Sequence, residues 1–151
     1  EADVALGTVY RHFRGKEDLL VAALSREMEA LQKAIRRRPP AGNTPLERAL
    51  AFFRAANRGV LSRPNFARAV IRALAGGDPE LHEATARFHD GNTALITEVI
   101  CGSTPVTERA RQAATVLQNV WFAALVGWTG GLFGDDGVMD RVAAACEQLL
   151  G

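Results

Sequence analysis

Apolar residues recur at intervals of three or four along almost the whole chain from Lys16 onward, which is the spacing of one helix face. The first stripe predicts a long helix that ends at the run Arg36 to Pro40. Cations suit the negative C-terminal end of a helix, and proline cannot continue its backbone hydrogen bonds. This stripe comprises Leu20, Leu24, Met28, Leu31 and Ile35.

Further helical stripes follow, each bounded by recognisable start and stop residues. Thr44, Pro45 and Glu47 have the spacing of a capping box that begins a second helix. The breaks after that helix fall at residues 62–64, 76–79, 102–105 and 130–137, and the last helix is expected from about Val138 to Leu150. No stretch alternates with the two-residue period of a strand, so the sequence predicts an all-α fold.

Composition narrows the function classes only slightly. The 151 residues carry 18 Lys plus Arg against 17 Asp plus Glu, so the net charge of +1 predicts neither a nucleic-acid nor a membrane partner. No apolar run reaches the ~18 residues that cross a bilayer, and no signal peptide opens the sequence. Cys101 and Cys146 show no metal or disulfide spacing, which favours a reducing, cytoplasmic location.

Residues 4–16 form the segment with the most distinctive chemistry. They contain three cations and no acid, interleaved with hydroxyl and imidazole groups. Such side chains bind phosphate oxygens, and small residues at the start of a helix allow it to enter a major groove. The alternative is an ordinary solvated helix face. The polar residues are Thr8, Tyr10, Arg11, His12, Arg14 and Lys16, and Leu6 and Gly7 are the small or apolar ones.

The string from Val4 to Phe13, followed by Gly15 to Leu20, resembles the recognition helix and the next helix of TetR-family transcriptional regulators. The resemblance implies an all-α homodimer with a helix-turn-helix domain and a larger effector-binding domain. It divides the chain into residues 1–38, the end of the DNA-binding domain with its connecting helix, and residues 39–151, the effector-binding and dimerisation domain. The family's first two helices are expected to precede Glu1.

The same resemblance assigns DNA contacts by position. It implies that Thr8, Tyr10 and Lys16 contact phosphates, and Lys16 also lies where helix N-terminal amides bind anions. Leu6, Gly7 and His12 are expected near base edges or the groove wall, with Arg11 in the same DNA-binding set. Ala5 departs from the usual Ser or Thr helix cap.

Further similarity, in residues 2–11 and 119–128, points to the branch of the family that represses cholesterol catabolism and responds to a steroid acyl-CoA. Dimerisation in the family uses the last two helices, here about residues 106–150. Small residues there, such as Ala113, Ala124 and Ala143, would allow close helix packing. Dimerisation also suits a palindromic operator, because two recognition helices must read successive half-sites.

Aromatic residues from four expected helices suggest an apolar effector pocket with a few polar groups. For each residue the alternative is an ordinary place in the core, and Trp121 and Trp128 could instead pack across the dimer interface. The candidate pocket residues are Phe52, Phe53, Phe66, Phe88, Asn92, Gln118, Trp121, Phe122, Leu125 and Trp128.

No catalytic, nucleotide-binding or metal motif appears, so we expect neither enzymatic activity nor a metal or cofactor. His82 and His89 lie seven residues apart, which is too far for a chelating pair on one helix. The expected function is that of a ligand-responsive repressor that a small apolar effector releases from operator DNA, with a steroid or an acyl-CoA as the candidate effectors. The alternative is a helical carrier that sequesters an apolar ligand and does not bind DNA.

Overall fold

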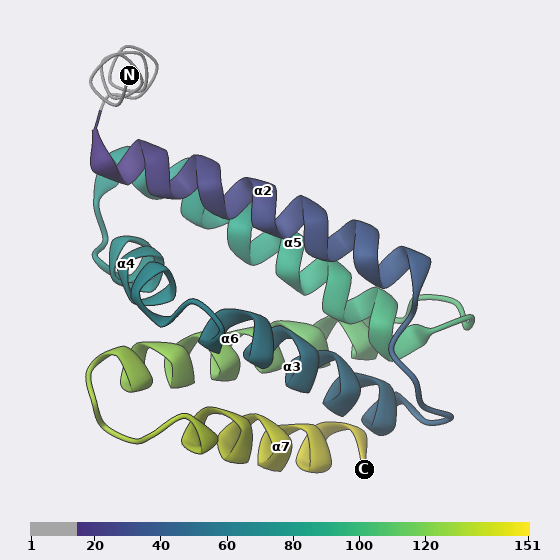
Figure 1. Cartoon of the computed structure of the whole chain (residues 1–151). Helices are drawn as coiled ribbons and strands as arrows, with labels where there is room; N and C mark the ends of the chain where they lie inside the picture. Colours follow the sequence, from purple (N-terminus) through teal and green to yellow (C-terminus); the bar gives the residue numbers. More distant parts are fainter. Residues whose placement is uncertain (1–14) are drawn as a thin grey trace.

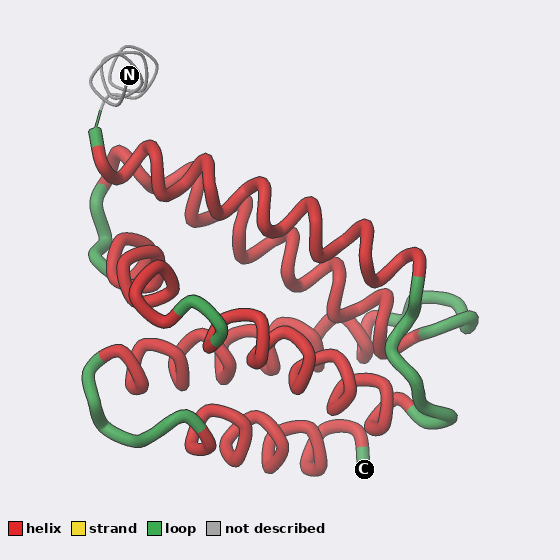
Figure 2. The backbone as a smooth tube through the Cα atoms, viewed as in Figure 1, coloured by secondary structure: helices red, strands yellow, loops and turns green. Residues whose placement is uncertain are grey.

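The computed structural model describes residues 15–151, which form helices joined by loops (Figures 1 and 2). This part of the chain contains no strand, and the all-α prediction is confirmed. The last helix begins two residues before the expected Val138. The elements are α2 (Lys16–Arg37), α3 (Pro45–Leu61), α4 (Pro64–Ala75), the short 3₁₀ helix η1 (Pro79–Leu81), α5 (His82–Cys101), α6 (Glu108–Thr129) and α7 (Asp136–Leu150).

The capping residues that the sequence identifies form the expected hydrogen bonds. Glu47 N donates to Thr44 Oγ1 at 3.1 Å, while the Glu47 carboxylate accepts from Thr44 N at 3.2 Å. This reciprocal pair is a complete capping box, with Pro45 in the first turn of α3. Asp78 caps η1 by accepting from Glu80 N at 2.9 Å. These caps fix where α3 and the segment before α5 begin.

The core lies among four helices. α3 and α6 each pack against both α5 and α7, and α2 runs along α5 and contacts α4 on the opposite side from α7 (Figure 1). The most deeply buried side chains come from α3, α5, α6 and α7 and include Phe52, Phe53, Ile96, Leu117 and Val142. No described side chain of α2 is fully buried. α2 is therefore less firmly held in the core than the other long helices. Within residues 15–151, no helix has the length and apolar character that a membrane crossing requires.

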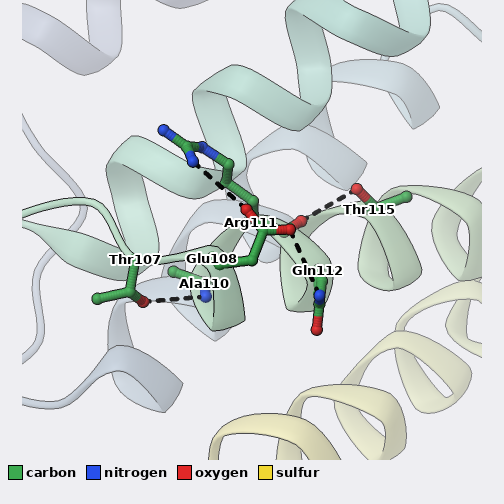
Figure 3. A network of polar contacts seen from close by, with 6 residues as sticks. All are labelled: Thr107, Glu108, Ala110, Arg111, Gln112 and Thr115. Atoms are coloured by element: carbon green, nitrogen blue, oxygen red, sulfur yellow. Dashed lines mark hydrogen bonds and ion pairs between the residues drawn. The ribbon is translucent and has the colours of Figure 1, made fainter.

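The first turn of α6 is held by side-chain contacts close to its start (Figure 3). Thr107 Oγ1 accepts from Ala110 N at 3.2 Å, which satisfies one of the amides that a helix start leaves unpaired. Glu108 adds a contact to Arg111 at 3.4 Å and another to Gln112 at 3.4 Å. This turn fixes the start of the helix that carries Trp121 and Phe122.

Replacing Thr107 with alanine is expected to lower the free energy of unfolding by about 1 kcal/mol, because the Ala110 amide loses its acceptor. Thr115→Ala is a matched control: the Thr115 hydroxyl donates to the Arg111 carbonyl inside the helix, and the residue is exposed. This second substitution is expected to change stability by less than about 0.5 kcal/mol. Urea denaturation followed by circular dichroism measures both. Equal effects on stability would show that the cap contributes nothing specific.

Candidate functional site

A cavity of about 260 Å³ lies between α2, α3, α4 and α6, with Phe88 of α5 at its wall. α2 contributes Leu24, Met28 and Leu31, which belong to its apolar stripe. Most of the other lining side chains are aliphatic or aromatic. Such a partly open apolar space between helices is the usual form of a small-molecule site, although its volume is just below the common range of ~300–1,000 Å³.

Half of the predicted pocket residues line this cavity. They are Phe66, Phe88, Trp121, Phe122 and Leu125, which come from α4, α5 and α6. Phe88 and Phe122 approach each other with ring centroids 6.1 Å apart. The structure thus brings together aromatic residues from three helices at one space. Their role in binding a ligand stays a prediction.

Three other predicted pocket residues lie elsewhere. Phe52 and Phe53 of α3 are almost completely buried, with ring centroids 5.1 Å apart, and the ring of Phe53 packs edge-on to Trp121 at 5.8 Å. Trp128, near the end of α6, donates its indole N–H to Asp135 at 2.8 Å, and the Arg68 guanidinium lies 4.6 Å from its ring centroid. The structure places these three side chains in the core or at the turn between α6 and α7.

The predicted polar pocket residues, Asn92 and Gln118, are buried but do not line the apolar cavity. The Gln118 side-chain nitrogen lies 3.2 Å from His89 Nδ1. Burial lowers the pKa of His89, and the nearby Asp90 carboxylate only partly opposes that effect. The lowered pKa favours the neutral ring, and in the tautomer that carries its proton on Nε2 the Nδ1 atom accepts the Gln118 N–H. Gln118 also borders an open groove between α5 and α6, on which Asn119 and Thr93 lie.

Sequence reasoning missed the aliphatic walls and a charged pair at the edge of the cavity. Val70 and Leu74 of α4 line the cavity, but neither is among the predicted pocket residues. Their helical stripes were the available signal. Glu27 of α2 and Arg63, between α3 and α4, also line the cavity and form an ion pair at 2.6 Å. The Arg63 guanidinium lies 5.3 Å from the Phe66 ring centroid.

Most of the predicted DNA contacts fall outside the described residues: Leu6, Gly7, Thr8, Tyr10, Arg11 and His12. Lys16 is the first residue of α2 and is exposed. It borders a surface depression that Arg68 and Arg72 of α4 also line. The end of α2 that follows the predicted DNA-binding segment therefore presents a cation to solvent.

Comparison with known proteins identifies the family. Residues 42–149 match the model of the tetracyclin repressor-like C-terminal domain. The chain belongs to the TetR family. This confirms the resemblance that residues 4–20 suggested, and it places the chain among transcriptional regulators and not among enzymes.

Relatives of this TetR-family chain carry the name HTH-type transcriptional repressor KstR. The protein from Rhodococcus jostii (strain RHA1) is 32% identical over 150 residues, which cover 99% of this chain and 69% of the relative. The protein from Mycolicibacterium smegmatis is 30% identical, with 99% and 73% covered. The crystal structure of a TetR transcriptional regulator from Rhodococcus sp. RHA1 matches with a TM-score of 0.77 and 21% identity, covering 95% of this chain and 76% of that chain.

Proposed function

We propose that the protein is a ligand-responsive transcriptional repressor, which binds palindromic operator DNA as a homodimer and is released by a small apolar effector. The observation that carries this proposal is the position of the apolar cavity. α2 forms one of its walls through Leu24, Met28 and Leu31, and the predicted DNA-binding segment directly precedes α2 in the sequence. A ligand in the cavity would therefore contact the helix that leads to the DNA.

The mechanism that we propose is a shift between two positions of α2. An effector that fits the cavity better in one position increases the population of that position. It lowers the affinity for operator DNA by its own difference in affinity for the two forms. The partial burial of α2 supports this mechanism, because moving a half-buried helix disturbs fewer core contacts than moving α5 or α6.

The dimer that we propose uses the outward surface of α6 and α7. Val116, Val120 and Ala123 fall on one outward stripe of α6, and Val116 is 45% exposed. Leu132, at the turn between α6 and α7, is 79% exposed. Exposed apolar side chains on α6 and at its turn to α7 favour a protein interface. Two-fold pairing there would create a four-helix bundle and would present two recognition helices to one palindrome.

Operator binding by the full-length protein, including the helices expected before Glu1, tests this function. A duplex selected from a random pool should bind with an affinity that falls steeply as salt rises, because phosphate binding releases counterions. Lys16→Ala should weaken binding to all selected duplexes. It should also reduce the slope of log affinity against log salt by about 0.9 for each phosphate that the protein no longer neutralises. Lys33→Ala, another exposed cation further along α2, is the control and should leave both unchanged.

The alternatives give different results in the same assay. A protein that shows no salt-dependent binding to any duplex, but binds apolar ligands, would be the carrier. If Lys16→Ala leaves DNA binding unchanged, Lys16 does not belong to the DNA-binding face, while the proposed repressor function still stands.

A further inference from the structure

We infer that the effector is an apolar molecule with one carboxylate, and that Arg63 binds this carboxylate in exchange for its present partner, Glu27. The inference rests on the proposed function, because it assigns the ligand class of the same cavity. It starts from the distribution of polar groups along the cavity wall. The polar side chains Glu27, Ser62 and Arg63 meet where α2 faces the turn between α3 and α4.

Arg63 is the one cation among the described residues that line the cavity. The Ser62 hydroxyl already donates to the Gly59 carbonyl at 2.7 Å. The buried indole N–H of Trp121 has no hydrogen-bond partner among the described residues, but it offers a single uncharged donor where Arg63 offers a positive charge. The guanidinium has five N–H donors in a planar fork that fits a carboxylate. Its place beside the Phe66 ring, 5.3 Å from the centroid, holds it at the apolar wall.

The present ion pair is suited to exchange. The side chains of Arg63 and Glu27 are 55% and 47% exposed, and ion pairs in such positions contribute little to stability. A ligand carboxylate offers the guanidinium the same chemistry as Glu27. Giving up Glu27 therefore costs little, whereas a ligand carboxylate that is free to align with the guanidinium can accept two parallel N–H bonds. The exchange thus favours the ligand at its head group, and burial of its apolar part adds further favourable free energy. An uncharged ligand of equal size would leave Arg63 paired with Glu27 and would gain only from the burial of its apolar part.

The exchange also provides a means of regulation. Glu27 belongs to α2, whereas Arg63 lies between α3 and α4, so their ion pair joins the connecting helix to the ligand-binding body. A ligand that takes over Arg63 removes this link from α2. The same interaction that selects a carboxylate would therefore favour the second position of α2.

Dodecanoate and dodecanol are suitable probes, because they differ at the head group and share the apolar chain. Calorimetric titration of the full chain with each probe should show that dodecanoate binds about tenfold more tightly than dodecanol. Arg63→Gln should abolish this preference. Glu27→Gln should increase the affinity for dodecanoate, because it removes the competing carboxylate, and leave dodecanol unchanged. Arg87→Gln is the control, since Arg87 pairs with Glu83 on the exposed surface of α5, away from the cavity.

The possible outcomes separate the two proposals. If neither probe binds the wild-type protein, the cavity is not a site for such ligands and the proposed function loses its supporting observation. If both probes bind with equal affinity, or if Arg63→Gln keeps the preference, the role of Arg63 is wrong while the apolar cavity stands. Glu27→Gln gives an independent result if Arg63→Gln fails to fold, and an unchanged dodecanoate affinity in that variant would contradict the exchange.

Discussion

Replacing Phe53 with alanine is expected to lower the free energy of unfolding by about 3–5 kcal/mol, the largest effect of any substitution proposed for this chain. Phe53 has no exposed surface and lies in the core shared by α3 and α6, with ring contacts to Phe52 and Trp121. Truncation removes a fully buried ring and leaves a cavity that neighbouring helices can only partly fill. Urea denaturation followed by circular dichroism measures the decrease.

Phe66→Ala is the matched comparison, because Phe66 is half-buried and lines the apolar cavity. Phe66→Ala is expected to lower the free energy of unfolding by less than about 2 kcal/mol, because a half-buried side chain has less buried apolar surface to lose. Phe66→Ala should reduce the free energy of dodecanoate binding by more than it reduces the free energy of unfolding. Equal decreases of stability in the two variants would mean that the distinction between a core phenylalanine and a cavity phenylalanine is wrong.

The sequence shows where helices begin and end, because those signals are local. Thr44, Pro45 and Glu47 predict the start of α3 from residues within one turn, and the observed capping box needs no distant partner. The stripe from Leu20 to Ile35 likewise predicts one continuous α2. The family follows from a local string as well. Such signals settle the elements and the class of fold.

The division between core and cavity depends on distant neighbours and could not be predicted in the same way. Phe53 and Phe66 both belong to inward stripes of amphipathic helices. Phe53 is fully enclosed because α3 packs between α5 and α7, whereas Phe66 faces the incompletely filled space beside α2. No residue within one turn of Phe53 or Phe66 indicates whether the ring lies in the core or at the cavity. The ion pair between Glu27 and Arg63 could not be predicted for the same reason, because 36 positions separate the two residues in the sequence.

Arg48 is a further residue whose role only the structure reveals, and its substitution has the second largest expected effect. Its side chain projects from α3 to the end of α5, where Nε donates to the Val99 carbonyl at 3.0 Å and Nη2 to the Ile100 carbonyl at 2.6 Å. The last carbonyls of a helix have no partner inside the helix, and a cation is favourable at this negative end. Nη1 also donates to the Asn43 carbonyl at 3.3 Å, in the loop before α3.

Arg48→Met is therefore expected to lower the free energy of unfolding by about 1.5–3 kcal/mol, because it keeps much of the apolar stem but leaves partly buried carbonyls without their charged donor. Arg54→Met, on an exposed part of the same helix, should change stability by less than about 0.5 kcal/mol. Urea midpoints report both values, and amide hydrogen exchange at the end of α5 should increase in Arg48→Met alone. If both variants unfold at the wild-type midpoint, water replaces the guanidinium at no cost in stability. In that case Arg48 would not hold α3 to α5, and the alignment of the helices behind the cavity would depend on the apolar core alone.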